Sequence, residues 1–161
     1  RHSWDNFYHL FLINPDGSDL EELPLHEAAW GSFSPDGQQI VYTRVATEDR
    51  TWKRYRGGLA PDLYIYDFRT GQDRKITDFP GTDRFPIWIG KEIYFQSDRD
   101  GTLNLWALDP ATGKARQATD HRDYDAGRPS GLGPEIVYEL GGTLRVLNTA
   151  NGQSRAERNW S

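Results

Sequence analysis

The stretch DLYIYDFRTGQDRKITD, residues 62–78, decides how the whole chain is interpreted. It holds two short runs, LYIYD at 63–67 and RKITD at 74–78, joined through a turn at RTG, 69–71. Ile, Leu and Tyr suit a half-buried pleated surface, and glycine accepts the backbone angles of a tight turn. The stretch therefore predicts two antiparallel β-strands.

Both runs recur along the chain. Relatives of the first begin at Leu, end in Asn or Asp and precede a glycine: LFLIN (10–14), LWALD (105–109) and LRVLN (144–148). RQATD (116–120) repeats the second run, and a third series comprises IVYTR (40–44), IYFQS (93–97) and IVYEL (136–140). The matching positions lie 53, 42 and 39 residues apart. A period near 40 with several short strands is typical of β-propeller blades.

The repeat predicts an all-β fold made of four-stranded antiparallel blades. We expect a single partial propeller over 1–161, with a half blade at 1–25 and blades at 26–78, 79–120 and 121–158. This is about three and a half blades, whereas closed propellers have 4–8. Open edge strands invite pairing, and the chain lacks methionine altogether. We therefore expect the missing blades in a larger parent polypeptide or in further copies of the chain.

The meander also assigns the loops to faces. The tight turns at 14–17, 34–37, 69–71 and 110–113 fall on one face of the disc. The opposite face carries an insertion at 44–61 and the crossovers at 77–86 and 119–129. Long loops gathered on one end of a rigid scaffold commonly carry function.

The insertion is the principal candidate site. Residues 44–61 carry a net charge of +3, which leaves −8 on the remainder of the chain. Its candidate partner- or peptide-binding residues are Arg50, Trp52, Lys53, Arg54, Tyr55 and Arg56. Arginine suits bidentate contacts to carboxylates. The alternative is that Trp52 and Tyr55 pin the loop to its own blade while the cations face solvent.

Two other motifs have structural interpretations that we favour. In DHRDYD (120–125), Asp and His could act as metal ligands or as acid and base. Asp125 and Asp83 each follow a Thr-Asp threonine by six residues, so we expect Asp125 to serve the blade-to-blade turn. SDRDG (97–101) resembles a calcium loop but lacks the full ligand pattern, so we interpret it as a hairpin turn.

Composition excludes several classes of protein. The net charge of −5 disfavours nucleic-acid binding, which normally needs a basic face on the domain. No apolar run is long enough to span a membrane, and the absence of cysteine excludes thiolate chemistry. We expect no catalytic residue, no metal and no cofactor in this chain.

Several motifs resemble a known family. SFSPDGQQIVYTR is similar to the generic blades of TolB-type propellers. A more specific set resembles the first, six-bladed propeller of tricorn-type serine peptidases, from about residue 7 to residue 152: TWKRYRGG, DLYIYDF, TGQ, ITDFPGTDRFPIWIG and IYFQSDRDGTLNLW. The resemblance identifies the loop from Arg50 to Gly58 as typical of that propeller.

The resemblance implies a non-catalytic segment of an oligomeric hydrolase. In that family two propellers precede the catalytic domains and are thought to filter or channel peptides, and the catalytic serine and histidine lie in later domains. It favours a cytoplasmic over a periplasmic location. The alternative is a TolB-like protein-binding scaffold without peptidase activity. A third possibility is a propeller hydrolase or lyase that uses Asp120, His121, Asp123 or Asp125.

Overall fold

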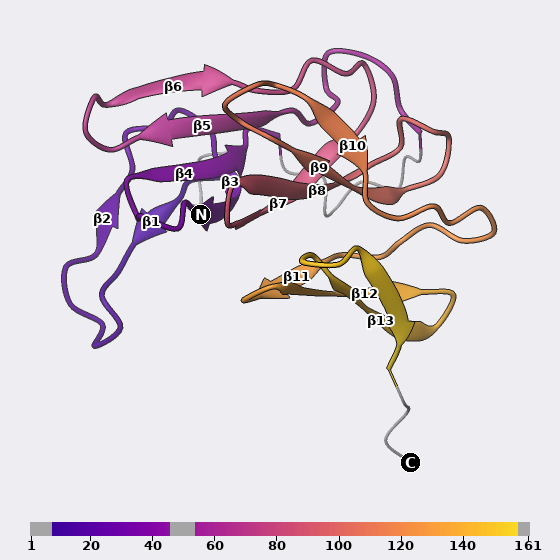
Figure 1. Cartoon of the computed structure of the whole chain (residues 1–161). Helices are drawn as coiled ribbons and strands as arrows, with labels where there is room; N and C mark the ends of the chain where they lie inside the picture. Colours follow the sequence, from indigo (N-terminus) through magenta and orange to yellow (C-terminus); the bar gives the residue numbers. More distant parts are fainter. Residues whose placement is uncertain (1–7, 46–53, 158–161) are drawn as a thin grey trace.

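The computed structural model describes residues 8–45 and 54–157, and in these ranges every regular element is a β-strand (Figure 1). The strands are β1 (Phe11–Leu12), β2 (Glu21–Glu22), β3 (Ala29–Phe33), β4 (Gln39–Thr43), β5 (Leu63–Asp67), β6 (Gln72–Lys75), β7 (Asp83–Ile89), β8 (Glu92–Ser97), β9 (Asn104–Leu108), β10 (Ala115–Gln117), β11 (Ser130–Leu132), β12 (Glu135–Leu140), β13 (Thr143–Asn148) and β14 (Gln153–Ala156). No helix in the described ranges is long and apolar enough to cross a membrane.

The strands form consecutive antiparallel sheets. Three have four strands, in the orders β3-β4-β5-β6, β7-β8-β9-β10 and β11-β12-β13-β14, and β1 pairs with β2 in a separate two-stranded sheet. Each four-stranded sheet is a simple meander, because neighbours in sequence are neighbours in space. This confirms the predicted fold class of propeller-like blades.

The repeated Leu-to-Asp run has a local physical cause. The Asp67 side chain accepts hydrogen bonds from the backbone N–H groups of Arg69 (2.9 Å) and Thr70 (3.1 Å) at the end of β5. Gly71 N then donates to Asp67 O at 2.9 Å, with a φ of 66° that favours glycine. The same backbone bond joins Gly113 to Asp109 and Gly152 to Asn148.

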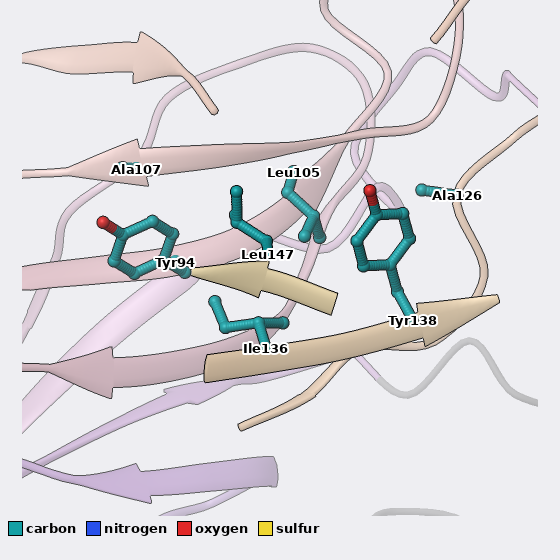
Figure 2. Packing of buried hydrophobic residues seen from close by; sticks show 7 residues of the cluster. All are labelled: Tyr94, Leu105, Ala107, Ala126, Ile136, Tyr138 and Leu147. Atoms are coloured by element: carbon teal, nitrogen blue, oxygen red, sulfur yellow. The ribbon is translucent and has the colours of Figure 1, made fainter. Parts of the chain in front are cut away.

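The core lies between sheets, in three clusters of apolar side chains. Strand β4 shows why: Ile40 and Tyr42 face the β1–β2 pair, whereas Val41 faces the sheet that contains β7–β10. Successive side chains of a strand point to opposite faces, so each blade packs against both of its neighbours. Figure 2 shows the third cluster, where Tyr94, Leu105 and Ala107 meet the last sheet. The residues that they meet are Ala126, Ile136, Tyr138 and Leu147.

The outer face of the last sheet carries three apolar side chains that no described residue fully covers. Leu132, Val137 and Leu144 are 88%, 40% and 53% exposed. The strand registers Leu132↔Glu135, Val137↔Val146 and Glu139↔Leu144 place these side chains on one face. This face lies opposite the one that carries Ile136 and Tyr138.

The recurrent threonine of the Thr-Asp motif closes the end of two of the blades. Thr119 Oγ1 accepts a hydrogen bond from Leu105 N and donates one to Asn104 Oδ1, both at 2.9 Å, and the residue is buried. Thr77 Oγ1 accepts the equivalent bond from Leu63 N at 2.9 Å. The motif therefore ties the last strand of a blade to its third strand.

Replacing Thr119 by valine is expected to lower the free energy of unfolding by about 2 kcal/mol, because the isosteric side chain leaves buried polar groups unpaired. Chemical denaturation measures this change. Thr112→Val is the control, because Thr112 lies exposed in a turn, and its effect should stay within about 0.5 kcal/mol. Equal losses for the two variants would contradict a special role of the Thr119 hydroxyl.

Candidate functional site

The basic insertion joins β4 to β5. Of its predicted binding residues, Arg54, Tyr55 and Arg56 lie in the described part of the chain. Arg50, Trp52 and Lys53 lie outside the described residues. The Tyr55 ring lies against Gly57, where a Cβ atom would meet the Tyr55 hydroxyl at 2.8 Å. Gly57 also has a φ of 146°, which suits glycine.

Arg54 and Arg56 contact the neighbouring blade. Arg56 Nη1 lies 2.8 Å from Asp98 Oδ1, and Arg56 Nη2 donates to Asp98 O at 3.2 Å. Arg54 Nε donates to Gly101 O at 2.8 Å. Asp98 and Gly101 belong to the turn between β8 and β9, where Gly101 N donates to Asp98 O at 3.0 Å. This confirms SDRDG as a hairpin turn and makes it the docking place of the insertion.

The segment between β6 and β7 lies beneath this contact. Asp98 Oδ1 also accepts a hydrogen bond from Thr82 N at 2.9 Å, and the Arg56 guanidinium lies 4.8 Å from the centroid of the Phe79 ring. A Cβ atom on Gly81 would stand 1.5 Å from Arg56 Nη1 and 2.6 Å from Asp98 Oδ1. Only a residue without a side chain fits under the ion pair.

A second ion pair lies in the same region. Arg99 Nη2 is 2.6 Å from Asp83 Oδ2, and the Asp83 side chain is fully buried. Burial raises the pKa of Asp83, and the positive charge of Arg99 opposes this rise. Arg99 also lies within 5.4 Å of the centroids of three aromatic rings, those of Phe79, Phe95 and Trp106. The two pairs together join the insertion, the crossover and the β8–β9 turn.

The first strands of the sheets carry an unusual cluster. Strand β7 lies against β3 and β11, and both β3 and β7 change register in mid-strand, between Ala29 and Ser32 and between Arg84 and Ile87. At these bulges Trp30 and Phe85 adopt φ values of 54° and 53°, which are rare for aromatic residues.

The two aromatic rings form a platform for an arginine. The centroids of Trp30 and Phe85 lie 5.2 Å apart with an interplanar angle of 85°. The guanidinium carbon of Arg128 lies 4.2 Å from the Trp30 centroid and 5.0 Å from that of Phe85, and the guanidinium carbon of Arg84 lies 4.9 Å from that of Phe85. We call Trp30, Arg84, Phe85 and Arg128 the inner-strand cluster.

Two cavities adjoin the inner-strand cluster. One of about 310 Å³ runs along the first strands of the three four-stranded sheets. Another of about 710 Å³ opens between the β8–β9 turn, the crossover 122–128 and the β12–β13 turn, and Arg54 lines it as well. Phe85 and Arg128 line both. The larger cavity thus brings together the loops that were predicted to share one face.

The crossover DHRDYD does not form an acid–base site in the described structure. Asp125 Oδ1 accepts a hydrogen bond from Leu103 N at 2.9 Å, and Asp120 pairs with Arg122 at 2.5 Å on the surface. His121 Nε2 lies 3.0 Å from the Tyr138 hydroxyl, and burial lowers the pKa of this histidine. Among the described residues, no group of three or more potential ligands is placed to hold a metal ion. Asp125 and His121 thus contact neighbouring segments of the blades, whereas Asp120 pairs within the crossover.

The alignment of Asp125 with Asp83 was wrong by one position. Asp83 pairs with Ser97 across the strands, and the equivalent bridge in the next blade joins Ala126 to Leu140. A shift of one residue reverses the face to which a side chain points. Asp83 is therefore buried against Arg99, whereas Asp125 holds a turn.

Sequence reasoning missed the inner-strand cluster. Its signal lies in three segments with no obvious likeness, AWGSF (29–33), RFPIW (84–88) and GRPSG (127–131). Each lies at or near the start of the first strand of a blade and carries Trp, Phe or Arg at its second position. Alignment of the first strands, as well as the second and third, would have found it.

The amino-acid sequence is similar to those of known proteins. Residues 1–153 match the sequence model of the family described as the tricorn protease N-terminal beta propeller domain. The chain is 29% identical over 154 residues to the putative tricorn protease homolog 2 of Streptomyces coelicolor, with 88% of this chain and 12% of that protein covered. It is 29% identical over 139 residues to the tricorn protease of Thermoplasma acidophilum, with 86% and 13% covered.

Solved structures show the same likeness. The crystal structure of the tricorn protease matches with a TM-score of 0.79 and 27% identity, over 92% of this chain and 14% of that one. A putative TolB from Agrobacterium tumefaciens matches with a TM-score of 0.72 and 18% identity, over 91% and 55%, which shows a shared fold. The chain thus spans 12–14% of the length of these tricorn relatives.

Proposed function

Because the chain belongs to the family of tricorn protease N-terminal β-propeller domains, we propose that it is a non-catalytic propeller segment of a tricorn-like serine peptidase. In this role it restricts and guides peptides toward or away from a catalytic centre in another part of the protein, and it docks neighbouring domains. Its basis is size selection and electrostatics, without bond-making by residues of this chain. A cytoplasmic location belongs to the same proposal.

The observation that carries the proposal is the cavity system beside the first strands. The 310 Å³ cavity follows β3, β7 and β11, and the 710 Å³ cavity, which shares Phe85 and Arg128 with it, lies among the loops. The sheets around them are fixed by clusters of buried apolar side chains. A path lined by rigid strands suits the passage of an extended peptide and excludes folded protein.

The proposed docking role rests on apolar side chains that stay exposed in the described part of the chain. Leu132, Val137 and Leu144 share the outer face of the last sheet, and Phe11 and Ile13 are 41% and 57% exposed at the other end. Apolar surface of this kind favours contact with another sheet. Since the chain spans 12–14% of its tricorn relatives, we expect the missing blades and further domains from the same polypeptide, with further copies of the chain as the alternative.

The predicted binding residues of the insertion divide into two groups with different proposed roles. Arg54 and Arg56 hold the insertion to the adjacent blade, although 43% of the Arg56 side chain stays exposed. We therefore propose that these two residues shape the loop-bearing face. Contact with a partner or peptide then falls to Arg50, Trp52 and Lys53, which lie outside the described residues.

A labelling experiment on the full-length protein tests the channel. Tyr124 is 62% exposed and lines the larger cavity, so Tyr124→Cys offers a point at which a bulky maleimide narrows the cavity. When the introduced cysteine is the one that reacts with the maleimide, labelling should slow the hydrolysis of long unfolded peptides severalfold, because the label occupies their path. Hydrolysis rates before and after labelling measure the effect.

Thr112→Cys is the matched control, because Thr112 lies exposed in the turn between β9 and β10. Its labelling should leave the rate unchanged. Equal rates for labelled and unlabelled Tyr124→Cys would overturn the channel role. Absence of any peptide hydrolysis by the full-length protein would favour the alternative, a TolB-like protein-binding scaffold, which the structural likeness to TolB supports.

A further inference from the structure

We propose that the inner-strand cluster binds the carboxylate at the C-terminus of a peptide. In this site Arg128 and Arg84 receive the carboxylate, and Trp30 and Phe85 receive the adjoining apolar side chain. The inference rests on the proposed function in one respect, since a peptide must reach the first strands. It goes further because it assigns a ligand chemistry to four named residues.

The backbone at the cluster is the first argument. Trp30 and Phe85 both adopt positive φ, at bulges in the first strands of two successive blades. Bulky residues keep such a conformation where the surroundings enforce it, and such positions gather at ligand sites. Here the two bulges bring the rings into an edge-to-face contact at 5.2 Å, with Trp30 still 36% exposed.

Arg128 is the second argument. Its guanidinium carbon lies within 5.0 Å of the centroids of both rings, and these contacts restrain the group and reduce the freedom lost when a ligand binds. Within residues 8–45 and 54–157, Arg128 has no ion pair or side-chain hydrogen bond, and its side chain is exposed. A pre-positioned guanidinium with unused N–H donors matches the planar, two-oxygen geometry of a carboxylate.

Arg84 is held in place by a buried glutamine. Its Nε donates to Gln96 Oε1 at 2.6 Å, and Gln96 is buried. Gln96 Nε2 in turn donates to the backbone oxygens of Ala126 and Gly127, in the crossover that leads to Arg128. A buried side chain thus ties the two arginines to one framework, and both guanidinium carbons lie within 5.0 Å of the Phe85 centroid.

The charges around the cluster favour a single carboxylate over a polyanion. The larger cavity is lined by four arginines and three carboxylates, namely Arg54, Arg84, Arg122, Arg128, Asp123, Asp125 and Glu139. Asp125 and Glu139 accept hydrogen bonds from backbone N–H groups, which keeps their charges in place. Repeated phosphates would meet these carboxylates, so a ligand with a single negative charge suits this mixed lining better than a polyanion does. The apolar walls of Trp30 and Phe85 further suit a peptide end with an apolar side chain.

Arginine labelling on the full-length protein tests this site locally. p-Hydroxyphenylglyoxal modifies accessible guanidinium groups, and mass spectrometry reports the rate at Arg128 separately from other positions. Acetyl-Ala-Ala-Phe with a free carboxylate should protect Arg128, whereas its C-terminal amide should not. Acetyl-Ala-Asp-Phe amide shows whether an internal acidic side chain can replace the terminal carboxylate, and we expect little protection from it. Arg69, exposed in the turn after β5, is the internal control and should be modified at one rate throughout.

Affinity measurements on variants give an independent test. Fluorescence anisotropy with an N-terminally labelled Ala-Ala-Phe should show about tenfold weaker binding of the acid form by Arg128→Gln, since a charge-assisted contact is lost. The amide form and the Arg69→Gln variant should show no change. Equal protection of Arg128 by acid and amide, or equal affinities in Arg128→Gln and the wild type, would overturn the assignment. Such a result would not affect the channel proposal, which is tested by labelling Tyr124→Cys. The two proposals can therefore fail separately.

Discussion

Replacing Gly81 by alanine is expected to lower the free energy of unfolding by about 3 kcal/mol, one of the two largest effects that we predict for this chain. The new Cβ would stand 1.5 Å from Arg56 Nη1, 2.5 Å from Phe79 Cε1 and 2.6 Å from Asp98 Oδ1. Arg56 can move away because its side chain is flexible, but Asp98 is 1% exposed and would lose its counter-charge. Urea denaturation measures the change.

The control is Gly58→Ala in the same loop. No atom lies within 4 Å of its added Cβ, and Gly58 does not adopt positive φ. This variant should be neutral, or more stable by up to about 1 kcal/mol through reduced freedom of the unfolded chain. A double-mutant cycle with Arg56→Ala locates the cause, because the two changes should be strongly non-additive if the clash acts through Arg56. Additive losses would contradict this account.

The fold could be predicted because its determinants are local. Each blade repeats short-range chemistry, such as the carboxylate of Asp67 that closes its own turn and the hydroxyl of Thr119 that binds Leu105 N. Such contacts need similar residue types at the same spacing wherever they recur. A single sequence therefore displays them as a repeat, and the predicted four-stranded antiparallel blades are confirmed.

The candidate site was harder to predict from the sequence because its contacts join segments that are distant along the chain. Arg56 meets Asp98, which lies 42 positions away, and only the packing of one blade on the next brings the two together. The charge pattern marked Arg54 and Arg56 as unusual but could not tell an outside partner from a turn of the same chain. Their role toward a partner or peptide stays a prediction.

The inner-strand cluster illustrates a second limit. Trp30 and Phe85 owe their orientation to bulges, and a bulge inserts a residue without any required residue type. Periodicity methods fail at such positions because the alternation breaks there. The error at Asp125 has the same origin, since counting from the threonine ignored the strand register that places Ala126 opposite Leu140.

Replacing Arg99 by glutamine is expected to give the other large effect, a loss of about 3 kcal/mol in the free energy of unfolding at pH 7. Arg99 Nη2 lies 2.6 Å from Asp83 Oδ2, and the Asp83 side chain has no exposed surface. Without the guanidinium, the ionised carboxylate would lie buried with no counter-charge, beside only the neutral hydroxyl groups of Ser97 and Thr77. Burial already raises the pKa of Asp83, and the loss of Arg99 should raise it further.

The pH dependence separates this charge effect from packing. A carboxyl group whose pKa is higher in the folded than in the unfolded protein destabilises the folded state above that pKa, and the loss disappears as the pH falls toward the unfolded value. The difference between wild type and Arg99→Gln should therefore shrink between pH 7 and about pH 4.5, as Asp83 takes up a proton in the variant. Urea denaturation at the two pH values measures it, and carboxyl groups common to both proteins cancel.

Arg116→Gln provides the comparison, because Arg116 pairs with Glu92 at 2.7 Å while half of its side chain is exposed. Its loss should stay below about 1 kcal/mol, since water screens an exposed pair. If Arg99→Gln lost the same free energy at both pH values, Arg99 would act through its contacts with Phe79, Phe95 and Trp106. A loss that fades in acid instead identifies Arg99 as the counter-charge that allows a carboxylate to lie buried beside β8.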